Sequence, residues 1–409
     1  MATIYPIKAL RPRQDLAPQV ASVPYDVVNR PEAKNLVRDN HHSFLHVTKP
    51  EIDLATDIDA YSTEVYAQGR TALDRLISEG ILVRDDEEHY FIYALTMNGR
   101  TQTGYVLLAS VEDYEQEIVK KHELTRPDKE EDRIKNITAL NAQSGTVFLL
   151  HRPDDCLSKI ITNAKQSPPI YDFTASDGIR HELWQIESAE QQLEITNAFA
   201  KQPALYIADG HHRSAAAAKV AQNLRGTPDH HQYAERFLAV SFSSDELLIL
   251  DYNRAVKDLN GHTPEAFLEK IQDRFELFSG QLEHPKPNHF EMYLGGSWYT
   301  LSTRDSVLTN SRGPISSLDV SILQTNILSP LLGIEDPRTD KRIAFIGGIR
   351  GRAELEKRVH EDCAVAFKLH PTSVEDLLEV ADAGEIMPPK STWFEPKLRD
   401  GLIIHMLTP

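Results

Sequence analysis

Apolar residues recur along the chain at two spacings, and turn-forming residues separate the segments that carry them. Helical spacing predicts helices, and short alternating or continuous apolar runs predict strands. The predicted helices cover residues 57–80, 128–142, 188–200, 214–224, 265–275, 318–328, 353–359 and 374–381. The predicted strands cover residues 88–95, 101–108, 146–151, 170–174, 179–186, 204–208, 237–242, 247–250, 343–346, 364–369 and 402–406.

Three pairs of strands are predicted to form hairpins, because residues that tolerate positive φ stand between them. These turns are 98–99, 176–178 and 295–296. Helices and strands alternate along the chain, so the sequence predicts an α/β (α+β) fold with mixed sheets. The pattern of residues and predicted elements changes along the chain. It suggests an N-terminal α/β segment at 1–110, a core domain at 111–280 and a C-terminal α/β domain at 281–409.

Composition excludes several classes of function. The chain has 409 residues, with 41% hydrophobic and 26% charged, as in a globular protein. Its formal net charge of −17 argues against nucleic acid as a partner. No apolar run approaches the ~18 residues needed to cross a bilayer, and the N-terminus lacks the pattern of a signal peptide. We therefore expect a cytoplasmic protein with no membrane partner. The sequence leaves the oligomeric state open, a homodimer included.

The strongest chemical signal is the sequence Ala-Asp-Gly-His-His-Arg at residues 208–213, between a predicted strand and an Ala-rich helix. A helix N-terminus attracts anions, and Gly210 lets the backbone approach one closely. Arg213 can donate two hydrogen bonds to a phosphate, and His211 and His212 add donors. Asp209 can orient or deprotonate a hydroxyl group. We expect an anion-binding loop, and we expect Arg213 to contribute little to the core.

A plainer alternative exists for this loop. Asp209 would cap the following helix, and the two histidines would be ordinary loop residues. A zinc site at His41–His42 or His230–His231 is not expected, because no further ligand stands at a suitable helical spacing. We therefore assign no metal-ligating residue from the sequence.

The loop resembles the phosphate loop of the ParB-like superfamily, which includes sulfiredoxin and the archaeal free-serine kinase. More of the chain resembles a bacterial family of domains of unknown function, the "ten-fifteen" family. The shared pieces are Val23–Val27, His122–Thr125 followed by Asp132–Arg133, the Asp-Gly-His-His-Arg loop, and Met387–Thr392 followed by Lys397. One departure is Asn253–Arg254, where the family pattern leads us to expect a His-Arg pair. The resemblance implies a ParB/sulfiredoxin-like core and phosphoryl transfer involving serine or phosphoserine.

The resemblance also implies roles for residues outside the loop. Glu123 becomes a candidate general base, beside Asp209 and His211 in the catalytic set. Further phosphate contacts are assigned to Lys390, Ser391, Thr392 and Lys397, and substrate contacts to Tyr25, Asp26, Arg133 and Arg254. Each has a plainer alternative: a charged helix end for Glu123, a Pro-rich surface connection for 387–397, an Asx-turn for Asp26 and a helix-surface pair for Asp132–Arg133.

The loop and the resemblance together favour a small-molecule phosphotransferase, and the resemblance implies that it acts on free serine. The donor would be ATP, ADP or pyrophosphate, held at the loop, and Mg²⁺ is expected because it neutralises phosphate oxygens in most such reactions. Two alternatives stay open at this point. One is a phosphatase acting on phosphoserine, and the other is a non-catalytic nucleotide sensor.

Overall fold

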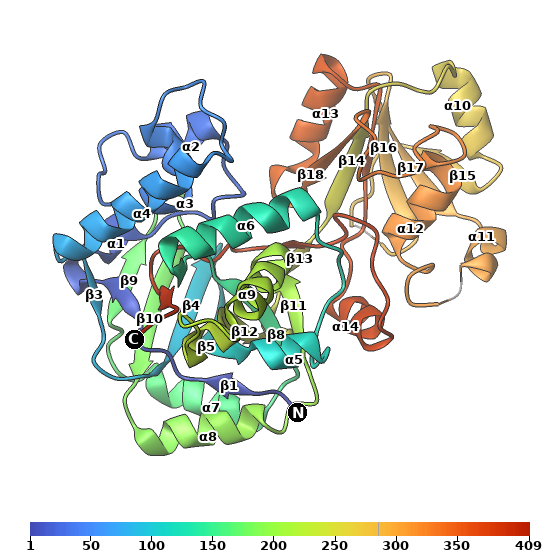
Figure 1. Ribbon diagram of the computed structural model, residues 1–409. Helices are drawn as coiled ribbons and strands as arrows, with labels where there is room; N and C mark the ends of the chain where they lie inside the picture. Colours follow the sequence, from blue (N-terminus) through green and yellow to red (C-terminus); the bar gives the residue numbers. More distant parts are fainter. Residues whose placement is uncertain (285, 312) are drawn as a thin grey trace. The chain divides into compact units, whose positions relative to one another are not determined.

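The computed structural model describes residues 1–284, 286–311 and 313–409, which form two units with a sheet in each (Figure 1). The first unit comprises Met1–Lys121, Thr125–Leu247 and Pro396–Pro409, and the second comprises His122–Leu124 and Leu248–Glu395. Helices and strands alternate in both units, so the predicted α/β fold with mixed sheets is confirmed. The three segments proposed from the sequence stay a prediction.

The first unit holds the loop and most of the strands. Its strands are β1 (Ile4–Tyr5), β2 (Leu10–Pro12), β3 (Leu82–Arg84), β4 (Tyr90–Met97), β5 (Arg100–Ser110), β6 (Val119–Lys120), β7 (Ala142–Gln143), β8 (Val147–His151), β9 (Tyr171–Thr174), β10 (Arg180–Ile186), β11 (Leu205–Asp209), β12 (Arg236–Ser243) and β21 (His405–Met406). Its helices are α1 (Ala17–Val20), α2 (Arg30–Leu36), α3 (Leu45–Thr48), α4 (Thr63–Ser78), α5 (Val111–Glu115), α6 (Pro127–Leu140), α7 (Asp155–Ala164), α8 (Ala189–Phe199) and α9 (His211–Leu224).

A nine-stranded mixed sheet organises this unit. Its order is β6-β11-β8-β12-β5-β4-β10-β9, and β1 pairs with β5. The pairs β6–β11 and β8–β12 are parallel, and the other neighbours are antiparallel. The β4–β5 hairpin turns at Asn98 and Gly99, which have φ of +52° and +79°. Both values are positive, as the predicted two-residue turn requires.

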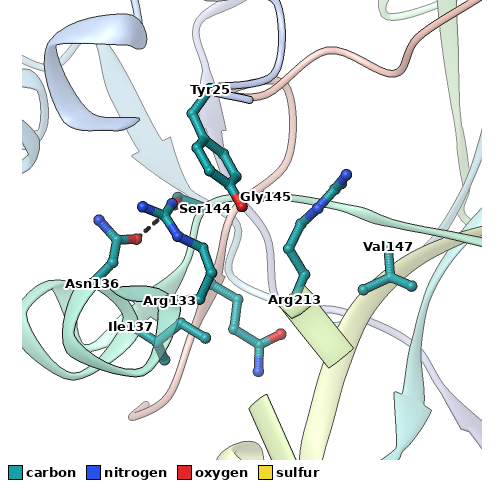
Figure 2. Close-up of a pocket in the computed structure, with 9 residues that line it drawn as sticks. Tyr25, Arg133, Asn136, Ile137, Ser144, Gly145, Val147 and Arg213 are labelled. Atoms are coloured by element: carbon teal, nitrogen blue, oxygen red, sulfur yellow. Dashed lines mark hydrogen bonds between the residues drawn. The ribbon is translucent and has the colours of Figure 1, made fainter. Parts of the chain in front are cut away.

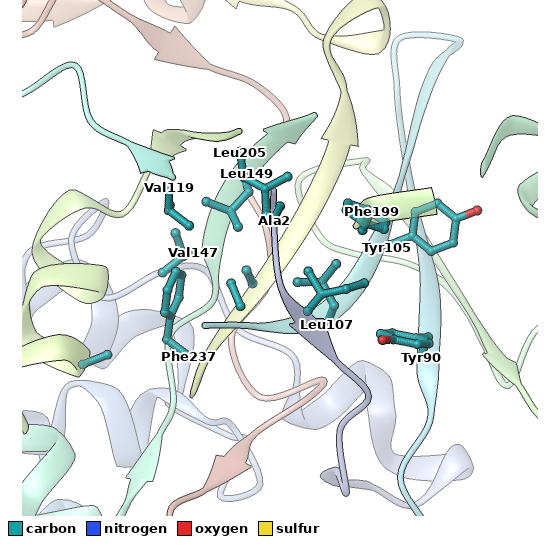
Figure 3. Close-up of a cluster of buried hydrophobic side chains, with 14 of the residues drawn as sticks. Ala2, Tyr90, Tyr105, Leu107, Val119, Val147, Leu149, Phe199, Leu205 and Phe237 are labelled. Atoms are coloured by element: carbon teal, nitrogen blue, oxygen red, sulfur yellow. The ribbon is translucent and has the colours of Figure 1, made fainter. Parts of the chain in front are cut away.

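The core of the first unit is a cluster of buried apolar side chains that come from the strands of this sheet and from helices (Figure 3). Strand residues such as Leu107, Leu149 and Phe237 are completely buried in it. Helix α9 contributes alanines to the same cluster, among them Ala216 and Ala221, which are also fully buried. Small side chains let a helix backbone approach a sheet closely. The Ala-rich stretch therefore fixes the helix whose first turn carries the loop histidines.

The second unit has a six-stranded antiparallel sheet of order β15-β17-β16-β19-β14-β18. The strands of this unit are β13 (Ile249–Leu250), β14 (Tyr252–Val256), β15 (Phe275–Ser279), β16 (His289–Leu294), β17 (Ser297–Thr303), β18 (Ile343–Gly347), β19 (Val365–Lys368) and β20 (Trp393–Phe394). Strands β13 and β20 pair with each other outside the six-stranded sheet. The helices of this unit are α10 (Pro264–Ile271), α11 (Asp305–Asn310), α12 (Asp319–Leu323), α13 (Gly351–Glu361) and α14 (Val374–Asp382). Within the described residues, no helix has both the length and the apolar character needed to cross a bilayer.

Several element boundaries differ from the prediction, among them the following three. Helix α9 begins at His211, whereas the sequence suggested residue 214, so the loop histidines and Arg213 lie in its first turn. The strand predicted at 402–406 is reduced to His405–Met406. The helix predicted at 318–328 is α-helical only to Leu323 and continues as a π-helical turn, Gln324–Leu328.

Acid should destabilise this fold through His151, which is buried beside Phe199 with ring centroids 5.0 Å apart. Burial lowers the pKa of His151 to about 4. The unfolded chain binds a proton first as the pH falls below about 6.5, so stability is lost below that value. Between about pH 7 and about pH 5 we expect a loss on the order of 2 kcal/mol from this residue alone.

Urea unfolding at several pH values tests this prediction on the wild type and His151→Asn. The variant should be less stable at neutral pH, because Nδ1 of His151 lies 2.8 Å from Ser241 Oγ. Its free energy of unfolding should fall less steeply below about pH 6.5. His284→Gln, at an exposed position, serves as the control. Parallel curves for wild type and His151→Asn would contradict the assignment.

Candidate functional site

The 209–213 loop is a single-residue turn between a strand and a helix. Strand β11 ends at Asp209 and helix α9 begins at His211, so Gly210 makes the turn. Gly210 has φ +101° and ψ +27°, in the left-handed region. A Cβ atom here would lie 3.3 Å from Cζ and Nε of Arg213 and 3.3 Å from Cα of Val147. Backbone conformation and crowding therefore both favour glycine.

Gly210 is also the N-cap of α9, so the residue at the cap position has no side chain. It occupies the cap position that the alternative interpretation gives to Asp209. Oδ2 of Asp209 instead accepts a hydrogen bond from Nζ of Lys397 at 2.9 Å. The N–H groups of Arg213 and Ser214 donate to the carbonyl of Gly210 at 2.9 and 3.0 Å. The positive end of the α9 dipole thus lies at the glycine turn.

Arg213 is a buried cation, with 9% of its surface exposed. Its Nη1 donates to the carbonyl of Thr146, and its Nη2 lies 3.6 Å from Asp209 Oδ1 and 3.9 Å from Asp26 Oδ2. Burial acts to lower the pKa of Arg213, but the carboxylates of Asp209 and Asp26 outweigh it and raise that pKa. The expectation that Arg213 contributes little to the core is therefore wrong. A charge buried this deeply must be compensated by the fold.

A second buried arginine, Arg133, lines a small cavity together with Arg213 (Figure 2). The guanidinium of Arg133 lies 3.7 Å from the centre of the Tyr25 ring. Its Nε and Nη2 donate to Asp132 Oδ2 at 3.0 and 2.6 Å, and Tyr66 donates to Asp132 Oδ1 at 2.9 Å. Burial raises the pKa of Tyr25 to about 12, so its hydroxyl is protonated at neutral pH. Asp132 and Arg133 are both buried, which rules out the helix-surface alternative.

The cavity between these residues is small, about 20 Å³. Arginines line two of its sides, and the remaining lining combines polar and apolar groups. Its lining residues are Tyr25, Arg133, Asn136, Ile137, Gln143, Ser144, Gly145, Val147 and Arg213. A space of this size accepts a water-sized group, whereas ligand pockets typically measure several hundred Å³.

The two loop histidines differ in their surroundings. His211 is buried, with 6% of its surface exposed, and His212 is half-buried. Nε2 of His212 accepts a hydrogen bond from the backbone N–H of Arg126 at 2.9 Å. In this arrangement Nε2 of His212 therefore serves as an acceptor and not as a donor.

In the second unit, the 387–392 segment is held mainly by its own backbone and its neighbours. Ser391 Oγ donates to the carbonyl of Pro388 at 2.6 Å, and the N–H of Met387 donates to the carbonyl of His122 at 2.8 Å. Lys390 has φ +58°, a left-handed conformation that is uncommon for a residue with a side chain. The Ser391 hydroxyl is thus engaged inside the segment.

Arg254 supports this segment from β14. Its Nη2 donates to the carbonyls of Pro389 and Lys390 at 3.2 and 3.0 Å, and its Nη1 donates to the carbonyl of Tyr252 at 2.6 Å. Only 3% of Arg254 is exposed, and burial lowers its pKa to about 10. The hydrogen bonds of Arg254 therefore hold the backbone of the 387–392 segment. Its assignment as a substrate contact stays a prediction.

The predicted site residues divide between the two units. The 209–213 loop, Tyr25, Asp26, Arg133 and Lys397 belong to the first unit, where Arg213, Asp26, Asp209 and Lys397 form one charged cluster. Glu123, Arg254, Lys390, Ser391 and Thr392 belong to the second unit. Thr392 Oγ1 lies 3.5 Å from Nε2 of His122 there. The approach of Glu123 and Lys390 to the loop stays a prediction.

Sequence reasoning missed two contributors to the charged cluster. One is the carbonyl of Thr146, which accepts from Arg213 just before β8. The other is Asp400, which is 2% exposed and whose Oδ2 has no hydrogen-bond partner among the described residues. Its sequence context, Leu-Arg-Asp-Gly, carries no motif that points to a buried acid. Its backbone pairing with Ser22 is a long-range contact that local patterns do not encode.

A family model described as "Protein of unknown function (DUF1015)" matches residues 4–321, which includes the whole 209–213 loop. The chain belongs to the DUF1015 family. The match ends before the 387–392 segment of this DUF1015 protein. A comparison with curated proteins found no match.

Several solved structures are similar to the DUF1015 chain at low identity. A free serine kinase in complex with AMP is 14% identical, with 73% of this chain and 91% of that chain covered and a TM-score of 0.37. A conserved hypothetical protein from Pyrococcus furiosus is 14% identical, with coverage of 74% and 95% and a TM-score of 0.37. C-terminally truncated SbnI from Staphylococcus aureus is 12% identical, with coverage of 74% and 87% and a TM-score of 0.40.

Replacing Gly210 with alanine should destabilise the protein for two reasons. The left-handed backbone costs about 1 kcal/mol or more for a residue with a side chain. The new Cβ would also press on the Arg213 guanidinium and on the backbone of Val147. Gly280→Ala is a matched control, because Gly280 has φ +102° with nothing within 4 Å of its Cβ position.

Chemical denaturation of both variants separates the two effects. We expect Gly210→Ala to lose roughly 1–2 kcal/mol more than Gly280→Ala, as tight packing around the added methyl predicts. Equal losses would mean that the loop relaxes around the methyl group and that Arg213 is not tightly held.

Proposed function

We propose that this DUF1015 protein is a small-molecule phosphotransferase, with kinase activity toward free serine. The observation that carries the proposal is the buried Arg213 guanidinium in the first turn of a helix that begins at a glycine turn. A fixed guanidinium and a helix dipole both favour a phosphate group. The fold fixes this charge before any ligand binds, and such preorganisation is what stabilises developing charge during transfer.

The size of the cavity limits what would enter it. With a volume of about 20 Å³ between Arg133 and Arg213, it would take an oxygen of a terminal phosphate but not a nucleotide. ATP, ADP or pyrophosphate would therefore bind with the rest of the molecule outside this cavity. Phosphate contacts from Lys390, Ser391 and Thr392 are part of the same proposal.

The acceptor is proposed to be free serine, on the sequence resemblance described above. Its hydroxyl oxygen would attack the terminal phosphorus, forming the new O–P bond as the bond to the leaving phosphate oxygen breaks. The hydroxyl proton would pass to a carboxylate, either Asp209 or Glu123. Lys397 fixes Asp209 at 2.9 Å and would keep its carboxylate pointed in one direction. Tyr25, Asp26 and Arg133 would contact the substrate.

Mg²⁺ would neutralise phosphate oxygens if it takes part. Carboxylates are the ligands that this site could offer, but Asp209 is already neutralised by Lys397 and Arg213. Mg²⁺ also tends to bind through few protein carboxylates and through the substrate's phosphates. We therefore assign no protein ligand and no step to the metal.

Product analysis tests the activity directly. The protein is incubated with serine, Mg²⁺ and one of ATP, ADP or pyrophosphate, and phosphoserine is followed by phosphorus NMR. We expect phosphoserine with at least one donor. Release of phosphate from added phosphoserine without a donor would identify a phosphatase. If neither reaction occurs and nucleotides only raise the melting temperature, the protein is a sensor and the proposal fails.

Arg213→Lys should slow the transfer by roughly a hundredfold or more, since one lost charge-assisted contact costs on the order of 2–4 kcal/mol in the transition state. An ammonium group cannot contact phosphate with two parallel hydrogen bonds. The variant should also melt lower, because the Thr146 carbonyl loses its guanidinium partner. Rates are compared at a temperature where both proteins remain folded.

Arg225→Lys is the matched control for this substitution. Arg225 follows the same helix but is more exposed and pairs with Glu115 and Glu235. Its replacement should leave the rate unchanged. A folded Arg213→Lys protein with a normal rate would remove Arg213 from the reaction.

A further inference from the structure

The segment that follows the second unit contacts the 209–213 loop through Lys397 and Asp209, and further contacts anchor it to other parts of the first unit. Arg399 donates through Nε to Nε2 of His181 at 3.2 Å and pairs with Asp177. Burial lowers the pKa of His181 to about 3, so the ring stays neutral and keeps an acceptor for Arg399. The backbone N–H and carbonyl of Asp400 pair with Ser22 at 3.0 Å each. These contacts fix the backbone position of Asp400.

The side chain of Asp400 lies in the charged cluster but takes no part in the mechanism above. It is 2% exposed, and its Oδ2 has no hydrogen-bond partner among the described residues. A Cβ atom placed on Gly145 would lie 3.1 Å from Arg213 Cδ and 3.9 Å from Asp400 Oδ1. Gly145 thus leaves the space in which the Arg213 side chain runs beside Asp400.

The charges that act on Asp400 come from several elements. Arg213 on α9 and Arg133 on α6 favour its ionised form, and Asp26 disfavours it. Beyond these, Asp209 lies beside Arg213 and is paired with Lys397, and Asp132 is paired with Arg133. Tyr25, His211 and His212 are the remaining titratable side chains of the loop and cavity. Burial is the largest influence and raises the pKa of Asp400 to about 7.

An anion that binds at Arg213 would add a negative charge beside a carboxyl group already short of hydrogen bonds. Two negative charges that lie close together in a buried site repel each other strongly, so it is energetically costly to keep both ionised. Protonation of Asp400 removes the conflict, and it leaves Arg213 with one fewer carboxylate to balance it.

We infer that Asp400 is a positioning residue of the anion site, which balances Arg213 when the site is empty and takes up a proton when a phosphate-like anion binds. The inference rests on the anion-binding role proposed for the loop, and it does not require phosphoryl transfer. Anion affinity is thereby linked to pH through a group that no ligand needs to touch. The substrate's phosphate would bind more tightly on the acid side of neutrality.

Sulfate is the probe, because its charge stays constant between about pH 6 and about pH 8.5, unlike that of phosphate. Calorimetric titration of the wild type should show the affinity for sulfate falling about tenfold from the acid to the alkaline end of this range. A tenfold change corresponds to a pKa of Asp400 that is about one unit higher with sulfate bound than without it. In Asp400→Asn the affinity should be flat with pH and should match the wild-type value at the acid end. The measurement involves no turnover, so it tests the inference about Asp400 even if the protein has no kinase activity.

Asp319→Asn is the matched control. Asp319 lies in the second unit, burial raises its pKa to about 7 as well, and its Oδ2 also lacks a partner among the described residues. This variant should keep the wild-type pH dependence. An unchanged pH dependence in Asp400→Asn would overturn the inference and assign the effect to His211 or His212. Loss of the dependence in Asp319→Asn would overturn it equally.

Infrared difference spectra of the wild type keep the inference testable if Asp400→Asn fails to fold. Addition of sulfate slightly above neutral pH should produce the carbonyl band of a newly protonated carboxylic acid. Histidine protonation gives no such band. Sulfate binding without this band would overturn the inference.

Discussion

The Arg213 guanidinium is the constraint around which the first unit's site is arranged. A full positive charge taken out of water is tolerated only when hydrogen bonds and opposite charges surround it. The chain meets this requirement with the Thr146 carbonyl and with carboxylates from Asp26 and Asp209. The chain also has glycine at positions 145 and 210, where a Cβ atom would press on the Arg213 side chain. The first unit's site is therefore built to hold a cation in place.

The sheet explains why residues so far apart in sequence meet at this cation. Strands β8 and β11 are antiparallel neighbours, with Phe148 opposite Asp209. The start of β8 thus lies beside the end of β11, which brings the 145–146 backbone to the glycine turn. Helix α6 adds Arg133, and the chain before α2 adds Tyr25 and Asp26. No single local motif contains this site.

Local patterns were enough to predict much of the fold. The Asn98–Gly99 turn and the strand–glycine–helix sequence at 205–224 follow from the conformational preferences of a few adjacent residues. Burial of Arg213, the inward hydrogen bond of Ser391 and the position of Asp400 could not be predicted, because each depends on partners brought by other elements or on the final backbone path. The helix boundary at His211 was missed for a related reason. Gly210 ends the strand and starts the helix at once, and a polar His-His-Arg turn has no apolar periodicity to reveal it.

The contact between Lys397 and Asp209 also bears on the order in which the protein can assemble. These residues are 188 positions apart, and the entire Leu248–Glu395 stretch of the second unit lies between them in the chain. During synthesis the loop emerges long before its lysine, so the strand and helix around Gly210 can form while Asp209 still lacks this partner. Closing so long a span is slow compared with local helix and hairpin formation. The charged cluster is therefore completed late, and a ribosome stalled within the second unit would display the sheet of the first unit with Asp209 still missing Lys397.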